Sequence, residues 1–305
     1  MNVSPVITIV IPTYNHADFL REALTSVLLQ TYSDWEVIVL NNYSEDDTVE
    51  VVRSFGDPRI RLENFRNNGV IGASRNRGIL LAKGRYIAFL DSDDTWYPDK
   101  LKNCLLYLEA GADLVGHALQ YRGGREGVLY CGPERHATFD AMLDKGSCIV
   151  PSSTIVRKEV LESVGGFSED PALVTSEDYH LWLRLAKAEI GMKFSREVLG
   201  EYRVHAGNQS SAVNKHLSSV LSVIGEFLPA TLPRGTLGWL RLRRRVALAY
   251  YSAGRGMQKN EQYQEALKMY VFSVVRRTNY IKTYIALGMT LLELAKAKLF
   301  ASKYR

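Results

Sequence analysis

Apolar, β-branched segments alternate with segments of helical spacing in the first third of this 305-residue chain, and this alternation constrains its fold most strongly. The predicted strands are residues 6–11, 35–40, 59–63 and 86–90, and the predicted helices between them are residues 19–30, 48–55 and 71–83. Strands that alternate with helices form a parallel sheet, and ligands bind beyond the carboxyl ends of its strands. The sequence therefore predicts an α/β fold with a mainly parallel central sheet.

Polar clusters follow three of these strands, at residues 13–15, 41–44 and 91–94. Because the carboxyl ends of parallel strands meet at one edge of the sheet, we expect these clusters to converge. The third cluster contains Asp91, Asp93 and Asp94. Crowded carboxylates raise one another's pKa or bind a hard divalent cation. A second interpretation stays open at this point, namely an acidic turn that caps a helix at residues 99–108.

The composition excludes several classes of protein. With 46% hydrophobic and 23% charged residues, the chain has the composition of a globular protein. Its three cysteines, Cys104, Cys131 and Cys148, are too few and too widely spaced for a disulfide framework or a thiolate zinc site. The N-terminus lacks the basic segment of a signal peptide, and no apolar run approaches the roughly 20 residues of a membrane-spanning helix. We therefore expect a cytoplasmic protein that does not span a bilayer.

The pattern changes beyond residue 113. The glycine-rich residues 116–132 predict either a hairpin or a mobile loop. The next predicted elements are a strand at 151–156, helices at 158–164 and 179–187, and a helical pair at 240–257 and 262–277 that resembles one tetratricopeptide-like hairpin and continues into 281–300. We predict a main domain at residues 1–214, with halves at 1–113 and 114–214, and a helical extension at 215–305.

The net charge of +5 is unevenly placed, because Lys and Arg crowd the last quarter of the chain. Anionic lipid headgroups and nucleic acid would both attract such a surface, and a solvated helical face is the alternative. A single helical hairpin cannot bury its own apolar face. We expect it to pack on the main domain, on a second subunit of a homo-oligomer, or on a membrane surface.

Several motifs occur in an order that is hard to obtain by chance. They are Ile9-Val10-Ile11-Pro12-Thr13-Tyr14-Asn15, Asn67-Asn68-Gly69, Ala73-Ser74-Arg75-Asn76-Arg77-Gly78, Gly84 to Asp94, Gly165-Gly166-Phe167, Glu177 to Arg184 and Tyr202-Arg203-Val204-His205. Between Val6 and about Ser211 the chain resembles the family 2 nucleotide-sugar glycosyltransferases, which are inverting enzymes of the GT-A fold. The resemblance implies a GT-A fold, a nucleotide-sugar donor and a divalent cation.

The resemblance also implies roles for the acidic strand end. Asp91-Ser92-Asp93 resembles the family's Asp-x-Asp motif, which implies that Asp93 ligates Mn or Mg. Asp91 and Ser92 would then face the donor, with Asp91 at the ribose or in the metal shell. His205 would complete the metal or diphosphate site, although a lone histidine is often structural. Asp94 is expected to cap the following helix.

The donor is expected at the end of the first strand. Pro12-Thr13-Tyr14-Asn15 lies where the family binds its pyrimidine, and Tyr14 would stack on the base, a core tyrosine being the alternative. Arg75 resembles the family's basic residue near the nucleotide, and its alternative is a surface arginine.

The pair Glu177-Asp178 resembles the family's catalytic carboxylates. Inversion requires a base opposite the leaving group, and by the resemblance this base is Asp178, with Glu177 orienting the acceptor or its loop. The alternative is that the pair caps the helix that begins at Tyr179. A capping carboxylate would have a lowered pKa.

The chain departs from the family at one motif. Where the family commonly has Asp-Asp-Gly-Ser, this chain has Asn41-Asn42-Tyr43-Ser44. An asparagine both accepts and donates hydrogen bonds, so Asn42 suits uracil, thymine or guanine, each of which presents an N–H beside a carbonyl. UDP is the expected nucleotide, with dTDP and GDP as alternatives.

The resemblance predicts a metal-dependent, inverting hexosyltransferase. It would move a hexose or N-acetylhexosamine from a nucleotide sugar onto a growing cell-surface glycan or a polyprenyl-linked acceptor, and no nucleic-acid partner is expected. The basic tail suits a peripheral position on the inner face of the cytoplasmic membrane. The alternative function is a non-catalytic scaffold protein of the same fold, in which Asn41 and Asn42 mark the loss of donor binding.

Overall fold

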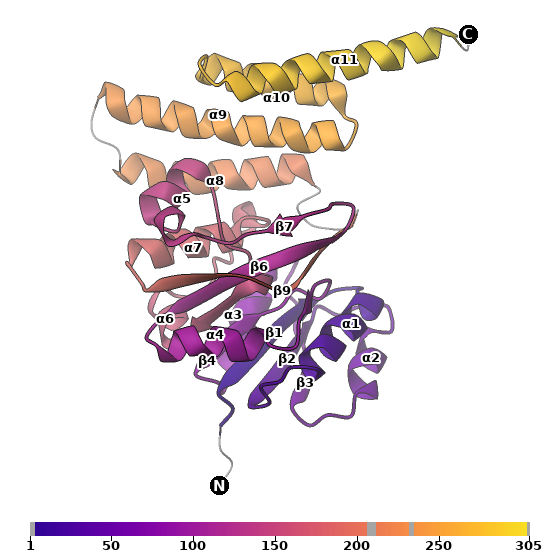
Figure 1. Ribbon diagram of the computed structural model, residues 1–305, viewed down its shortest axis with the longest axis vertical. Coiled ribbons are helices and arrows are strands. Elements are labelled where there is room, and N and C mark those ends of the chain that lie inside the picture. Colours follow the sequence, from indigo (N-terminus) through magenta and orange to yellow (C-terminus); the bar gives the residue numbers. More distant parts are fainter. Residues whose placement is uncertain (1–3, 206–211, 232–234, 304–305) are drawn as a thin grey trace. The chain divides into compact units, whose positions relative to one another are not determined.

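The computed structural model describes residues 4–205, 212–231 and 235–303. The chain forms two compact units. The first comprises Met1–Met142 and Gly146–Ala206, and the second comprises Leu143–Lys145 and Gly207–Arg305. A sheet with helices makes up the first unit, and long helices make up the second (Figure 1). Within the described ranges, no helix is long and apolar enough to cross a membrane.

The strands are β1 (Ile7–Thr13), β2 (Trp35–Asn41), β3 (Ile60–Asn64), β4 (Tyr86–Phe89), β5 (Thr95–Trp96), β6 (Leu114–Gly123), β7 (Val128–Leu129), β8 (Thr154–Arg157) and β9 (Met192–Val204). The helices of the first unit are α1 (Ala17–Leu28), α2 (Thr48–Ser54), α3 (Ile71–Leu81), α4 (Lys100–Glu109), α5 (Phe139–Lys145), α6 (Lys158–Ser163) and α7 (Glu177–Lys187), of which the end of α5 belongs to the second unit. Short 3₁₀ turns occur at Glu134–His136, Pro151–Ser153 and Pro171–Leu173.

One sheet organises the first unit, with the strand order β3-β2-β1-β4-β8-β6-β9-β5 and β7 paired to β6. The first four strands are parallel. The mainly apolar, buried sequences of β1, β2 and β4 agree with this, because a strand covered on both faces carries few polar residues. All seven residues of β1 are buried. Beyond β4 the sheet also contains antiparallel pairs, β4 with β8 and β8 with β6. The α/β prediction is confirmed.

Two glycines bring α3 close to its neighbours. A Cβ atom on Gly78 would lie 2.5 Å from Val10 Cγ1 of β1, and one on Gly72 would lie 2.6 Å from the Ser168 carbonyl oxygen. Such distances are far shorter than van der Waals contact, so only glycine permits this approach. Arg75 lies between the two glycines and is therefore held deep in the unit.

The second half of the first unit resolves one open prediction and contains a strand and a helix that the sequence analysis did not predict, β9 and α5. Residues 116–132 form the hairpin alternative, because β6 and β7 pair antiparallel. The 13-residue strand β9 was not predicted. Only four of its thirteen residues are buried and several are charged, so β9 lacks the apolar run that marks β1 and β2.

The second unit is helical, as predicted. It contains α8 (Val213–Thr231), α9 (Thr236–Lys259), α10 (Tyr263–Arg276) and α11 (Ile281–Lys303). One of its buried clusters consists of Met257, Ala266, Tyr270 and Ala286. A Cβ on Gly254 would lie 2.5 Å from the Tyr270 ring, so this glycine lets α9 and α10 pack closely.

The first unit holds one lysine side chain away from water. Lys100, the first residue of α4, is fully buried, and its Nζ lies 3.5 Å from the centre of the Trp96 ring. No described residue hydrogen-bonds this Nζ. Burial lowers the pKa of Lys100 to about 7, because the ammonium loses its hydration and gains only a cation–π contact.

We predict that Lys100→Met stabilises the protein. Between about pH 7 and its ordinary pKa of 10.5 the native Lys100 binds fewer protons than the unfolded one, so native stability rises with pH in this window. The substitution should raise the free energy of unfolding at pH 7 by roughly 2–4 kcal/mol and flatten its rise toward pH 10. Urea unfolding at several pH values measures both effects. The exposed neighbour gives the control, Lys102→Met, which should change stability by less than about 0.5 kcal/mol. A loss of stability in Lys100→Met at pH 7 would contradict the prediction.

Candidate functional site

The predicted polar clusters do converge at the carboxyl edge of the parallel strands. Thr13 of β1 pairs with Asn41 of β2, and the Asn42 N–H donates to the Thr13 carbonyl oxygen over 3.0 Å. β4 lies on the other side of β1 and runs into Asp91. The strand order therefore brings together segments that lie about 28 to 78 residues apart in sequence.

A buried arginine connects the acidic turn after β4 to α7. Arg75 is 3% exposed. Its Nη2 lies 2.7 Å from Asp91 Oδ1, and its Nη1 lies 2.7 Å from Glu177 Oε1. Burial lowers the pKa of Arg75, but the charges of the two carboxylates outweigh this and raise its pKa above the ordinary value. The alternative of a surface arginine is therefore wrong.

Asp178 follows Glu177 in the first turn of α7 and is partly buried. Its Oδ1 accepts a hydrogen bond from the Tyr179 N–H over 2.6 Å. Burial and the neighbouring charge of Glu177 raise the pKa of Asp178 to about 7, while the charge of Arg75 opposes the rise. The lowered pKa expected of a capping carboxylate is therefore not found. A carboxyl group with a pKa near neutrality can exchange a proton with a substrate hydroxyl.

The second pair of interest consists of Asp93 and His205. Their Oδ2 and Nε2 atoms lie 2.9 Å apart, and both side chains are mostly buried. Burial and the charge of Asp91 raise the pKa of Asp93, and the hydrogen bond with His205 opposes that rise.

A carboxylate oxygen and an imidazole nitrogen are both ligand types for divalent cations. The 2.9 Å between Asp93 Oδ2 and His205 Nε2 is a hydrogen-bond distance. Within the described ranges, no group of three His, Cys, Asp or Glu side chains is placed to hold a metal ion. Of the predicted set of Asp91, Asp93 and His205, the structure thus brings two together, while the Asp91 carboxylate contacts Arg75. An ion held here would take its other ligands from phosphate oxygens and water.

Asp94 does not cap the next helix, so that prediction is wrong. The residue that precedes α4 is Asp99, whereas Asp94 Oδ1 accepts the backbone N–H of Arg203 over 2.8 Å. Burial raises the pKa of Asp94 well above its usual range, with the charges of Asp93 and Asp91 adding to the rise. Asp94 therefore fixes β9 to the acidic turn.

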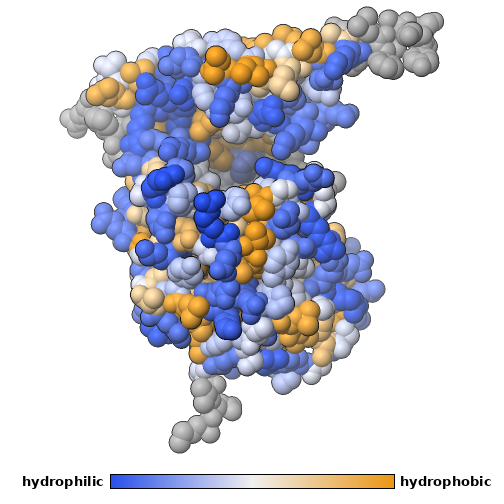
Figure 2. Space-filling model, viewed as in Figure 1, coloured by the Kyte–Doolittle hydropathy of each residue, from blue (hydrophilic) through white to orange (hydrophobic). Residues whose placement is uncertain are grey.

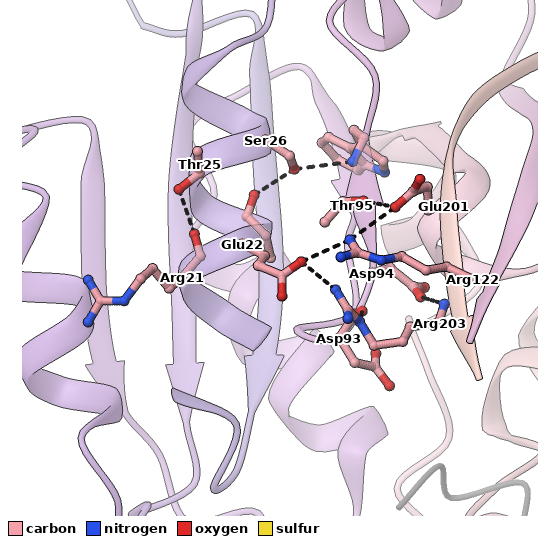
Figure 3. A network of polar contacts seen from close by, with 12 residues as sticks. Arg21, Glu22, Thr25, Ser26, Asp93, Asp94, Thr95, Arg122, Glu201 and Arg203 are labelled. Carbon is pink, nitrogen blue, oxygen red and sulfur yellow. Dashed lines mark hydrogen bonds and ion pairs between the residues drawn. The ribbon is translucent and has the colours of Figure 1, made fainter. Parts of the chain in front are cut away.

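Arg203 completes this attachment (Figure 3). Its Nε donates to the Asp93 carbonyl oxygen over 2.9 Å, and its Nη2 lies 2.6 Å from Glu22 of α1. Glu22 also pairs with Arg122 of β6, whose Nη1 lies 3.2 Å from Glu201 of β9. This network holds Asp93 against His205, which lies two residues after Arg203.

Sequence reasoning missed the role of His16. Its Nδ1 lies 2.9 Å from Ser92 Oγ, and its ring meets the His205 ring edge-on at 5.9 Å between centroids. The only sequence signal was its position directly after the polar cluster that ends β1. The ring of Phe19 lies 4.9 Å from that of His205 and helps to orient it.

The end of β1 leaves polar groups available. Thr13 is buried, and no described residue hydrogen-bonds its Oγ1. Tyr14 is 51% exposed, so the alternative of a core tyrosine is wrong. Asn15 binds the loop after β2, because its Oδ1 accepts the Glu45 N–H over 2.8 Å. A buried hydroxyl without a partner next to an exposed aromatic ring suits a bound polar ring system.

Comparison with known proteins decides the family. Residues 8–165 match the family model described as Glycosyl transferase family 2. The chain is also 31% identical over 262 residues to the UDP-Glc:alpha-D-GlcNAc-diphosphoundecaprenol beta-1,3-glucosyltransferase WfaP of Escherichia coli. The aligned region covers 84% of this chain and 95% of WfaP. The chain belongs to glycosyl transferase family 2.

Solved structures agree with this assignment at the level of the fold. S. aureus TarS 1–349 in complex with UDP-GlcNAc matches with a TM-score of 0.63 and 18% identity, covering 88% of this chain and 81% of that one. The mannosyltransferase PcManGT of Pyrobaculum calidifontis, in complex with GDP-Man and Mn2+, matches with a TM-score of 0.58 and 17% identity, covering 95% and 81%. The GT-A fold predicted from the sequence is confirmed.

Asn41 and Asn42, in the motif that departs from the family pattern, have different roles. Asn41 is buried, its Oδ1 accepts from Ser44, and its Nδ2 donates to Asn64 Oδ1 over 2.9 Å. Asn42 Oδ1 accepts the Asn67 N–H over 3.0 Å, and because a backbone N–H can only donate, this fixes the orientation of the amide. Asn41 thus shapes the loop, while Asn42 keeps its Nδ2 as a donor that no described residue uses.

We predict that the Arg75 ion pairs dominate the stability of this site. Arg75→Met leaves two buried carboxylates without their cation and should cost about 3–5 kcal/mol of unfolding free energy. Arg77→Met is a matched control two residues further along α3, because Arg77 pairs with the partly exposed Glu63 at 2.6 Å and should cost less than about 1 kcal/mol. Urea unfolding measures both losses. If Arg75→Met does not fold, Arg75→Lys should show an intermediate loss of unfolding free energy. Equal losses in the Arg75→Met and Arg77→Met variants would contradict the prediction.

Proposed function

We propose that this glycosyltransferase moves a hexose or N-acetylhexosamine from a nucleoside diphosphate onto a lipid-linked glycan, with inversion at the anomeric carbon. The observation that carries the proposal is the double ion pair of Arg75. It ties the acidic turn, where a diphosphate would bind, to the helix turn that presents Asp178. A donor site and a base are thereby connected through one side chain.

Asp178 acts as the base in this proposal. Its carboxylate accepts the proton of the acceptor hydroxyl while the hydroxyl oxygen bonds to the anomeric carbon. The bond from that carbon to the diphosphate oxygen breaks at the same time, so the configuration inverts. Support comes from the pKa of about 7, which leaves much of Asp178 ionised at neutral pH and still basic enough to take a proton.

The donor binds through the ends of β1, β2 and β4. Asp93 and His205 would hold Mn or Mg, which when bound stabilises the charge that develops on the diphosphate. Thr13 Oγ1 and Asn42 Nδ2 would hydrogen-bond the base or ribose, and Tyr14 would stack on the base. Support comes from the unpartnered Thr13 hydroxyl, the orientation of the Asn42 amide and the exposure of the Tyr14 ring. Arg75 holds Asp91 and Glu177 in place in this proposal, because its Nη2 donates to Asp91 Oδ1 and its Nη1 donates to Glu177 Oε1.

The relatives guide the choice of substrates. WfaP uses UDP-Glc and an acceptor on diphosphoundecaprenol, as its name states, and a TarS structure contains UDP-GlcNAc. The PcManGT structure contains GDP-Man, so nucleotides other than UDP occur on this fold. We propose a UDP-sugar donor and a polyprenyl-linked acceptor, with dTDP and GDP sugars as the alternatives to be tested.

We predict a metal-dependent gain in thermal stability with the correct nucleotide. A ligand at about 100 times its dissociation constant adds about 2.7 kcal/mol to the free energy of unfolding. UDP with Mn should therefore raise the melting temperature more than dTDP or GDP, and Asp93→Asn should remove the part of the shift that depends on Mn. The absence of any Mn-dependent shift, with every nucleotide tested, would contradict donor binding.

We predict that Asp178→Asn abolishes transfer and keeps donor binding. The amide cannot accept the proton, so turnover should fall by roughly 10²–10⁴-fold while the nucleotide-induced thermal shift remains. In the unmodified protein the rate should rise with pH up to about 7 and then level off, as the base becomes ionised. Asp34→Asn, an exposed position before β2, is the control and should keep the rate and its pH profile. Retained turnover in Asp178→Asn would move the base to another residue.

A further inference from the structure

The two units of the chain differ in the sign of their net charge. Residues 207–305 contain sixteen Lys and Arg against four Glu and no Asp, whereas residues 1–206 contain 22 Lys and Arg against 29 Asp and Glu. The net charge of +5 is therefore the sum of a strongly basic second unit, which is helical, and an acidic first unit. A basic unit of this kind attracts an anionic partner, and a second copy of itself would repel it.

The last helix also presents an apolar face to solvent. Ile281, Ile285, Met289 and Leu292 of α11 are 71%, 58%, 49% and 63% exposed. Their spacing of three or four residues places them along one side of the helix. Thr283, Ala286 and Thr290 lie on the opposite side and are buried. The exposed side of α11 is therefore an apolar stripe, which the described part of the chain leaves uncovered.

Basic side chains border this stripe. Lys282 and Lys296 are exposed and, at helical spacing, lie beside Ile285 and Met289. Arg276 and Arg277 precede α11, and the Arg277 guanidinium stacks on the Tyr280 ring at 4.7 Å. Exposed Val271 and Val275 of α10 add further apolar area. Figure 2 shows hydrophobic side chains interspersed with hydrophilic ones over this helical unit.

We propose that the exposed face of α10 and α11 binds the surface of an anionic lipid bilayer. Apolar side chains flanked by Lys and Arg suit a helix that lies at the boundary between headgroups and acyl chains. Within the described ranges no helix can span a membrane, so the contact is with the surface. This inference stands apart from the proposed reaction, because it rests on the helical unit alone.

Vesicle sedimentation with the full chain tests the proposal. Vesicles of phosphatidylcholine with about one third phosphatidylglycerol should bind the protein at least about tenfold more strongly than pure phosphatidylcholine at low salt. The difference should shrink at about 0.5 M salt, where the charges are screened. Equal binding to both vesicles, or no binding to either, would overturn the proposal.

Variants distinguish the lipid surface from other occupants of the face. Ile285→Asp should lower binding to the anionic vesicles by about tenfold. Leu106→Asp is the matched control, because Leu106 is 62% exposed on α4 of the other unit, and its binding should stay unchanged. Thermal unfolding verifies that both variants fold, and Lys282→Glu serves as a second variant that should also weaken binding. An Ile285→Asp protein that binds vesicles normally would overturn the proposal. Light scattering could also overturn the proposal. If it shows a dimer that Ile285→Asp dissociates, a second copy of the chain covers the face.

Discussion

The ion pairs of Arg75 are the interaction on which the rest of the site depends. A buried cation is stable only where anions compensate the loss of hydration, and Asp91 and Glu177 do so at 2.7 Å each. The close approach of α3 that places Arg75 requires Gly72 and Gly78. One guanidinium thereby connects the acidic turn to the first turn of α7, although Asp91 and Glu177 lie 86 residues apart in the sequence.

The carboxyl groups around this cation differ because their partners differ. Glu177 and Asp91 have the Arg75 guanidinium. Asp178 does not contact it directly, so burial and the charge of Glu177 prevail and its pKa rises to about 7. Burial, with the charges of Asp93 and Asp91, raises the pKa of Asp94 well above its usual range, and Asp94 Oδ1 holds β9 by accepting the Arg203 N–H. Neighbouring acids thus differ in their contacts and in their pKa according to burial and to the charges around them.

Prediction from the sequence succeeded where the signal was local. The runs of β1, β2 and β4 and the spacing of α9 and α10 are properties of consecutive residues, so their elements were found. β9 was missed because its half-buried, charged sequence resembles a loop. The cap assigned to Asp94 was wrong because its partner, the Arg203 N–H, lies 109 residues away. His16 gave no signal, since its partners Ser92 and His205 are brought to it only by the fold.

The sequence by itself determined the family, the alternation of strand and helix, and the residue types that carry the chemistry, because motifs and periodicity are written along the chain. The tertiary structure alone decided which acidic side chain contacts which basic side chain. It turned Asp91 toward Arg75, paired Asp93 with His205, and gave Asp178 its raised pKa. The physical reason is that charge interactions depend on distance and burial in three dimensions. Residues 75, 91 and 177 acquire both only when α3, β4 and α7 pack together.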